Sequence, residues 1–305
     1  MLEVVRESSN TYKEKIKSGT FLFYCSNCSS FNKALPSDDW SLRNQVICEK
    51  CSLGGRFRHL NEIIEKVKPP ESNPNVVIFE DVTLFAQVLK RKYSNLKTSE
   101  YFDGYKSGDK VSYEPIKDYF ITNQDIQNTS YESSSIDLII HGDVYEHIPS
   151  IQNALLEAKR ILKKGGFMIF TMPLYDFVEE TVVRAKINNG KLVFLMPKHY
   201  HGNPLSQKGA LVFTEPGREF LDLAEKLGFD IKISLGFDPL RGYFPDCNQI
   251  NEGHCWNHVF ILNLKDSDGE TNQINNYKKN KINFLKKTIK DLKKKARVKF
   301  FSLLR

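Results

Sequence analysis

Residues 135–151 read SIDLIIHGDVYEHIPSI, a short apolar run followed at once by a cluster of ionisable side chains. The run over residues 136–140 is too short for a buried helix and is rich in β-branched residues, so it predicts a central strand of a parallel sheet. Ligands of open α/β sheets bind beyond the carboxyl ends of the strands. We therefore expect a ligand site around the side chains that follow this strand, which are His141, Asp143, Glu146 and His147.

The segments on either side of this stretch alternate between strand and helix patterns. Apolar runs predict further strands over residues 76–79, 95–100, 167–172, 229–236 and 258–264. Apolar residues at helical spacing predict helices over 82–93, 151–162 and 214–228. Ser150 is the expected N-cap of the second helix. This alternation predicts an α/β fold with a Rossmann-like, mostly parallel sheet.

The 305-residue chain divides into parts of different composition. In order, these are a cysteine module (1–65), a proline-rich linker (66–75), the α/β body (76–265) with an insertion (174–212), and a linker with a basic tail (266–305). No apolar run reaches the roughly 18 residues that span a bilayer, and residues 1–15 lack the apolar core of a signal peptide. We therefore expect a cytoplasmic protein.

Four cysteines in the first part form two equal pairs, Cys25 with Cys28 and Cys48 with Cys51. Each two-residue gap brings both thiolates to one side of a tight turn, so the pattern predicts a zinc ribbon. Four thiolates leave no position for a substrate, and the zinc is therefore expected to be structural. The alternative is four unrelated buried thiols. The later residues Cys247, His254, Cys255 and His258 match no common metal-site spacing.

Basic charge is concentrated at the C-terminus. The formal net charge is +7, yet residues 276–305 carry twelve Lys or Arg and one acid, which leaves about −4 for the rest of the chain. Residues 282–305 also place apolar side chains at spacings of three and four. We expect a basic amphipathic helix that lies on an anionic membrane surface, making the protein peripheral to the membrane; the alternative is packing on the body or a partner subunit.

Residues 134–173 resemble the class I S-adenosylmethionine-dependent methyltransferases, in particular the branch with a DxxEH motif after the fourth strand, here DVYEH. The resemblance extends more loosely over residues 76–264. A subgroup with a cysteine-pair module also has HGNPLS, here residues 201–206. The resemblance implies a seven-stranded sheet, with S-adenosylmethionine bound across the strand ends.

The first loop departs from the family, whose members have glycines after the first strand. Residues 76–87 read VVIFEDVTLFAQ and contain none. Glu80 stands where the resemblance places the first-strand acid, and we expect a wider loop in which Thr83 also contacts the donor. Because glycine normally permits close approach of the backbone to the ligand, loss of donor binding is the alternative.

The resemblance assigns further donor contacts. Glu100 and Tyr101 end the second strand, where the carboxylate would hold both ribose hydroxyls. Asp125 and the Ile126 amide would hold adenine, and the segment His141, Gly142, Asp143 would line the methionine part and the sulfonium. The alternative for each acid is a solvated carboxylate at a strand end or in a loop.

Histidines are the expected catalytic residues for a hydroxyl acceptor, because imidazole titrates near neutral pH. His147 is the candidate base, with a helix-start role as its alternative, and Glu146 is interpreted as a structural residue at the helix start. His199 and His201 lie in the insertion, which is expected to form a loop over the site.

Three functions fit these features. The first is methylation of a sugar hydroxyl in a surface polysaccharide or its lipid-linked precursor, and the second is RNA methylation with the zinc ribbon holding the nucleic acid. Residues 21–60 carry no strong stripe of phosphate-binding cations, so nucleic acid is the less favoured partner. The third is a zinc-containing scaffold on a catalytically degenerate domain.

Overall fold

The computed structural model describes residues 11–37, 41–67, 69, 72–174, 178–246 and 257–265, and the segment Ser9–Lys265 is one compact unit. The expected tail helix lies outside the described residues, as do Cys247, His254 and Cys255. In the described part of the chain, no helix is long and apolar enough to cross a membrane.

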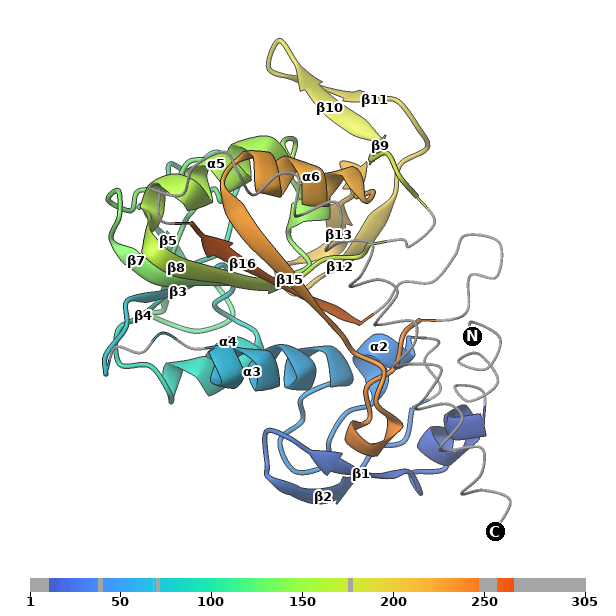
Figure 1. Cartoon of the computed structure of the whole chain (residues 1–305). Helices are drawn as coiled ribbons and strands as arrows, with labels where there is room; N and C mark the ends of the chain where they lie inside the picture. The colour runs from blue at the N-terminus through green and yellow to red at the C-terminus, as the bar shows by residue number, and fades with distance from the viewer. Residues whose placement is uncertain are drawn as a thin grey trace, which may run out of the picture. The chain divides into compact units, whose positions relative to one another are not determined.

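The body is built on one mixed sheet with the strand order β15-β16-β8-β7-β3-β4 (Figure 1). The strands are β3 (Val76–Ile78), β4 (Leu96–Thr98), β7 (Ile136–Gly142), β8 (Leu162–Thr171), β15 (Phe229–Leu235) and β16 (His258–Leu264). Strands β4, β3, β7 and β8 pair in parallel, whereas β16 runs antiparallel to both of its neighbours. The expected mostly parallel sheet is therefore confirmed, with β7 at its centre.

The sheet has six strands in the described residues, not the seven that the family resemblance implied. Beyond β4, a parallel bridge joins Glu100 to Asn123, directly after the short strand β6 (Phe120–Thr122). Strand β6 pairs with β5 (Lys110–Ser112) in a separate hairpin. Because β6 makes its ladder with β5, only one bridge is left to continue the main sheet.

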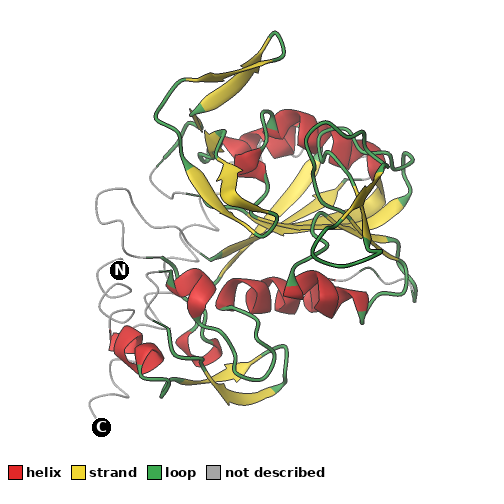
Figure 2. Ribbon diagram, turned by 180° about the vertical axis from the view of Figure 1, so that it is seen from behind, coloured by secondary structure: helices red, strands yellow, loops and turns green. Residues whose placement is uncertain are grey.

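Helices cover both faces of the sheet, two on each (Figures 1 and 2). One face carries α3 (Gly55–Val67) and α4 (Leu84–Lys90), and the other carries α5 (Ile151–Ile161) and α6 (Glu219–Lys226). Apolar side chains of α3 and α4 pack with Ile78, Leu138 and Ile140, while α5 and α6 pack with Ile139 and Phe170. Alternate residues of β7 thus enter opposite cores, as its continuous apolar run predicts.

Two boundaries differ from the sequence expectation. Ser150 caps α5 by accepting from the Asn153 amide, as expected, but the KKGG stretch after the helix belongs to β8. Helix α6 begins only at Glu219, because Thr214 and Glu215 form the short strand β14 against β9 (Val182–Val183). Tertiary pairing takes these residues from the helix that their local pattern predicts.

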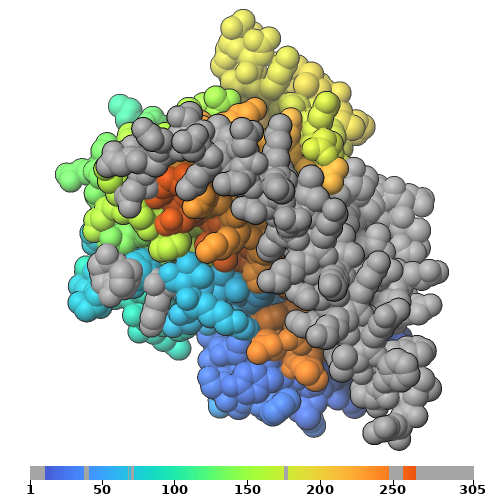
Figure 3. Space-filling model, in the orientation of Figure 1, coloured from blue at the N-terminus to red at the C-terminus, as the bar shows by residue number. Residues whose placement is uncertain are grey.

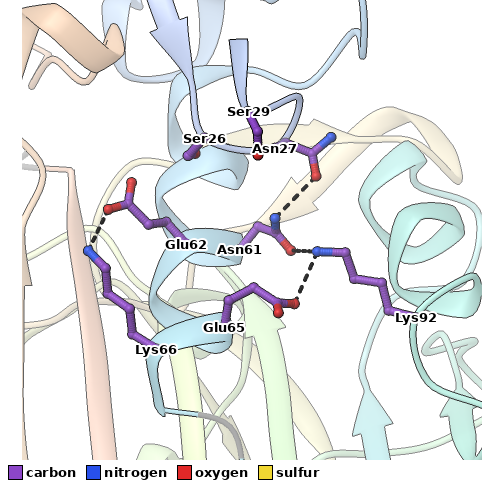
Figure 4. A pocket seen from close by; sticks show the side chains of 8 residues that line it. All are labelled: Ser26, Asn27, Ser29, Asn61, Glu62, Glu65, Lys66 and Lys92. Carbon is purple, nitrogen blue, oxygen red and sulfur yellow. Dashed lines mark hydrogen bonds and ion pairs between the residues drawn. The ribbon is translucent and has the colours of Figure 1, made fainter.

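The cysteine module contains β1 (Leu22–Cys25), β2 (Ser30–Lys33) and the short helix α2 (Leu42–Gln45), and residues 11–17 are also helical. Helix α3 extends past residue 65, where the module was expected to end, and its apolar side chains pack on one face of the sheet. A surface hollow of about 340 Å³ lies where the module meets α3 (Figure 4). There Lys92 donates to Asn61 and Glu65, and Asn61 donates to Asn27. These groups join the module to the body.

The insertion forms two hairpins where a loop was expected. They are β10 (Ala185–Asn188) with β11 (Lys191–Phe194), and β12 (Tyr200–Asn203) with β13 (Ser206–Leu211). The first projects from the surface (Figures 1 and 3). The second lies against the 3-10 turn η1 (Tyr145–His147), since the His147 ring is 2.9 Å from the Leu211 carbonyl oxygen. A further turn, η2 (Pro239–Arg241), precedes the contacts of Tyr243 with the module.

Candidate functional site

The loop after β3 is built without glycine because its backbone requires none. Among its residues, Glu80 to Thr83, no residue has a positive φ. Thr83 caps α4 by accepting from the Ala86 amide at 3.1 Å, and its hydroxyl donates to Glu80 Oε2 at 2.7 Å. Side-chain hydrogen bonds therefore hold the backbone of this loop in its turn, whereas comparable loops commonly use glycines to make the turn.

Asp81 anchors the same loop to its neighbours. Its carboxylate accepts from the hydroxyls of Thr98, on β4, and Tyr119, and it forms an ion pair with Lys90 of α4 at 3.3 Å. All three partners come from the strand and helix that flank the loop or from the adjacent turn. The Asp81 carboxylate is thus occupied by contacts that hold the loop in place.

Glu100 closes the loop from the end of β4. Its Oε1 accepts from the backbone amides of Asp81 at 2.7 Å and Val82 at 3.2 Å, while burial raises the pKa of its carboxyl. The neighbouring side chain of Tyr101 is 58% exposed. Glu100 therefore contacts the first loop directly, which sequence spacing alone could not show.

The predicted adenine segment lies beside Glu100, because the Gln124 amide donates to the Glu100 carbonyl at 2.9 Å. The Asp125 carboxylate accepts hydrogen bonds within its own segment, from the backbone amide of Gln127 at 2.9 Å and from the Gln127 side chain at 3.1 Å. Ile126 is buried in the core. The first loop, the end of β4 and this segment thus meet at one edge of the sheet.

Gly142 ends β7 with no room for a side chain. A Cβ there would lie 2.8 Å from Glu80 Oε1 and 3.2 Å from the Phe57 ring. Glu80 is buried, and its Oε1 has no hydrogen-bond partner within the described residues. Burial raises the pKa of Glu80 to about 7. An acid that titrates near neutrality therefore faces the end of the central strand.

Asp143 lies at the centre of an ion cluster. Arg43 of α2 contacts both of its oxygens at 2.6 and 2.7 Å, Arg56 of α3 lies at 2.5 Å, and Thr171 donates at 2.8 Å. Although burial opposes ionisation, the two guanidinium groups hold the pKa of Asp143 well below its usual range. Its carboxylate is therefore neutralised by the chain itself.

Sequence reasoning missed both of these arginines. Neither belongs to a recognisable motif, and they lie in the cysteine module and at the start of the helix that follows it. The Arg56 Nε has no hydrogen-bond partner in the described part of the chain. No local signal in the sequence marks either residue, since their role depends on how the module meets the body.

The His141 ring does not lie among these polar groups. It is fully buried between Tyr145 and Phe170, with ring centroids 4.4 and 4.5 Å away. Burial lowers the pKa of His141 to about 3, so the ring is neutral in the apolar layer below α5 and α6. Strand alternation explains this placement, because residue 141 faces the opposite core from Ile140. Only the backbone of His141 therefore lies at the carboxyl end of β7 with the predicted donor residues.

The three histidines that were predicted to be catalytic, His147, His199 and His201, gather near Glu146 of η1. Oε1 of Glu146 lies 3.6 Å from His147 Nε2 and 3.7 Å from His201 Nδ1. The rings of His147 and His201 are perpendicular at 5.0 Å, and the His199 ring meets that of His201 at the same distance. The three histidines that were predicted to be catalytic therefore form one cluster, with Glu146 at its buried end.

The four cysteines of the module also converge. The Sγ atoms of Cys25 and Cys51 are 3.7 Å apart, and those of Cys28 and Cys48 are 4.0 Å apart. Zinc at about 2.3 Å from four sulfurs separates them by about 3.8 Å, so this donor set fits a tetrahedral zinc ion. The cluster was predicted from spacing, and the structure brings its members together.

Comparison with known proteins supports the assignment of the body. Residues 85–170 match the family model described as "Methyltransferase domain". This segment contains β7, η1, α5, most of β8 and most of α4, together with the predicted adenine segment. Among curated proteins, none matches the sequence.

Several solved structures match this chain at low sequence identity. An S-adenosylmethionine-dependent methyltransferase from Mesorhizobium loti is 12% identical, with a TM-score of 0.41 over 67% of this chain and 97% of its own. Haemonchus contortus phosphoethanolamine N-methyltransferase 2 is 15% identical, with a TM-score of 0.42 over 68% of this chain and 53% of its own. The [4+2]-cyclase SpnF is 11% identical, with a TM-score of 0.43 over 68% of this chain and 81% of its own. From the domain match and the sequence motifs together, we conclude that this chain carries a class I S-adenosylmethionine-dependent methyltransferase domain, with a four-cysteine cluster near its N-terminus.

Proposed function

We propose that the chain transfers a methyl group from S-adenosylmethionine to a hydroxyl of a sugar in a surface polysaccharide or its lipid-linked precursor. The donor would lie across the carboxyl ends of β3, β4 and β7. Glu80, Glu100 and the segment around Asp125 come from neighbouring elements at this edge.

The observation that carries this proposal is the pair of opposite charges beside Gly142. The methionine end of the donor is a zwitterion with an ammonium and a carboxylate. Glu80 Oε1 and Arg56 Nε are buried polar atoms without hydrogen-bond partners among the described residues, and both residues lie next to Gly142. Buried polar atoms normally have partners, so a zwitterionic ligand would satisfy both.

The remaining contacts are proposed from the positions of the side chains at this edge. Glu100 uses Oε1 for the loop amides, which leaves Oε2 for a ribose hydroxyl. Asp125 and Ile126 lie beside Glu100 and would hold adenine. Thr83 would act by holding the first loop in place, and Tyr101 would form part of the rim of the donor site. Because Arg43 and Arg56 neutralise Asp143, no free carboxylate of Asp143 would face the sulfonium at the end of β7.

The reaction forms a bond between the acceptor oxygen and the methyl carbon as the carbon–sulfur bond breaks. The bonding electrons pass to sulfur, which gives S-adenosylhomocysteine, and the hydroxyl proton leaves to a base or to solvent. His147, His199 and His201 supply polar groups beside η1 on the acceptor side. A polyhydroxyl acceptor fits this cluster because imidazole nitrogens both donate and accept hydrogen bonds.

A zinc ion is the proposed occupant of the four-cysteine cluster, with a structural role. Four thiolates would complete its coordination and leave no open position. Its role would be limited to stabilising the fold of the module, which places Arg43 in contact with Asp143.

Replacement of Glu100 tests the donor site. Glu100→Ala would lose hydrogen bonds to the ribose, so we expect S-adenosylhomocysteine to bind at least about tenfold more weakly in calorimetry. The exposed acid Glu114 provides the matched control, since Glu114→Gln should leave affinity unchanged. Equal affinity of Glu100→Ala and wild type would remove Glu100 from the site.

A further inference from the structure

Glu146 is buried in a way that requires explanation. Its side chain is 1% exposed, and neither carboxylate oxygen has a hydrogen-bond partner within the described residues. Two imidazoles lie within 4 Å of its carboxylate, and no lysine or arginine forms an ion pair with it in the described part of the chain. A buried carboxylate without partners is strongly unfavourable, so the site calls for a compensating cation.

The two imidazoles are arranged as ligands would be. His147 Nδ1 lies 2.9 Å from the Leu211 carbonyl oxygen, so this nitrogen carries the proton and donates it. The lone pair of His147 therefore lies on Nε2, the atom that faces Glu146. Histidines that bind metals commonly donate their other nitrogen to a carbonyl in this way, which fixes the ring.

His201 completes the group from the opposite element. A register shift in the β12–β13 hairpin between His201 and Asn203 turns the backbone there, and His201 Nδ1 lies 3.7 Å from Glu146 Oε1. One donor atom from each of Glu146, His147 and His201 lies within 4.8 Å of the others. Three ligands at about 2.0 to 2.2 Å from one ion are separated by about 3.0 to 3.5 Å, so modest side-chain rotation would close the site.

We infer that Glu146, His147 and His201 form a binding site for a divalent transition-metal ion, separate from the four-cysteine cluster. Two imidazoles and one carboxylate suit ions such as Zn²⁺, Mn²⁺, Fe²⁺ and Co²⁺. Three protein ligands leave coordination positions open, and the group directly follows the end of β7. Resting on the proposed function, this site would bind the acceptor hydroxyl and lower its pKa, with His147 as a ligand rather than the base.

Cobalt titration of the zinc-loaded full-length chain tests the site. Co²⁺ bound by imidazole and carboxylate absorbs weakly in the visible range, without the intense sulfur charge-transfer band of a thiolate site. We expect about one additional Co²⁺ per chain. Glu146→Gln and His201→Ala should each weaken its binding at least about tenfold, because each removes a ligand. Glu114→Gln, at an exposed acid, is the matched control for Glu146→Gln, and it should bind Co²⁺ as wild type does.

Two outcomes would overturn the inference. One is wild type, holding one zinc per chain at the thiolates, that takes up no Co²⁺, which would make the cluster an acid–base group of hydrogen-bonded side chains. The other is undiminished uptake by both ligand variants. S-adenosylhomocysteine binding by the same samples reports on folding and on the donor site independently of the ion. Loss of cobalt with retained S-adenosylhomocysteine binding is therefore the expected result for the ligand variants.

Discussion

At Glu80, burial of a single acid bears directly on the proposed recognition of the donor. In the chain without ligand its pKa is raised to about 7 by burial. The ammonium of the donor would favour the ionised carboxylate. Below about pH 7 binding would first require loss of a proton, so affinity should fall as the pH falls through the pKa.

This predicts a pH dependence with a definite sign. Between about pH 7.5 and about pH 6, the affinity for S-adenosylhomocysteine should drop about eightfold, following the ionised fraction of a group with a pKa of about 7. Calorimetry across this range measures it. Glu80→Gln cannot ionise, and its affinity should be weaker than wild type at pH 7.5 and nearly flat. A variant with the same slope as wild type would assign the titration to another group.

Individual residues were only partly predictable. The acids at strand ends and the four cysteines follow from local patterns, and the structure brings them together as expected. The orientation of His141 follows from strand alternation, which a motif-based interpretation overlooked. Arg43 and Arg56 reach Asp143 through tertiary packing of a separate module. No spacing in the sequence carries that information.

At the scale of elements, the β12–β13 hairpin determines the position of His201. Gly209 faces His201 across the hairpin with a φ of +79°, and a Cβ there would lie 2.3 Å from the His201 carbonyl oxygen. Gly190 also has a positive φ, +73°, but a Cβ there would have no neighbour within 4 Å. Substitutions at these two glycines therefore distinguish the cost of backbone strain from the effect of displacing His201.

Alanine at each position should therefore have different effects. Both substitutions place a side chain on left-handed backbone and should cost roughly 1 to 2 kcal/mol of folding free energy. Gly209→Ala should also displace His201 and reduce Co²⁺ affinity, whereas Gly190→Ala should not. Thermal unfolding and cobalt titration measure the two effects. Equal cobalt affinity in both variants would show that the hairpin does not position His201.

Elements with strong periodic patterns were predicted well, since β7, β15 and β16 lie where their apolar runs placed them. The errors lie where tertiary pairing competes with local preference. Thr214 and Glu215 pair with β9 instead of starting a helix, and KKGG extends β8. The missing seventh strand has the same cause, because β6 pairs with β5.

At the scale of the molecule, the cysteine module is physically connected to the sheet edge where the donor is proposed to bind. Arg43 lies between the two cysteine pairs in sequence, and it contacts both Asp246 and Asp143. Loss of zinc should therefore weaken donor binding as well as the module itself. This coupling is absent from models in which the module serves only to recruit a partner.

Elemental analysis and calorimetry test that coupling. Wild type should hold one zinc at the thiolates, and Cys48→Ser should lower the zinc content, the melting temperature and the affinity for S-adenosylhomocysteine. Cys247→Ser, outside the paired cysteines, should retain thiolate-bound zinc. Full zinc content in Cys48→Ser would contradict the proposed ligand set.

The basic tail is predicted from sequence to recruit the protein to anionic membranes. Each basic residue near such a surface contributes about 1 kcal/mol, so truncation after Ser267 should abolish vesicle binding at moderate salt. Affinity for S-adenosylhomocysteine should be unchanged, because the donor residues all precede the truncation. Vesicle sedimentation measures the first effect, and full retention of binding by the truncated chain would assign membrane contact elsewhere.

The central claim is that the sheet edge formed by Glu80, Gly142 and Glu100, whose first loop contains no glycine, binds the methyl donor. Calorimetric titration of the full-length wild-type chain with S-adenosylhomocysteine tests it most directly. The account predicts saturable binding of one ligand per chain, well below millimolar concentration. No heat of binding at millimolar ligand, from protein with full zinc content and a cooperative unfolding transition, would contradict it.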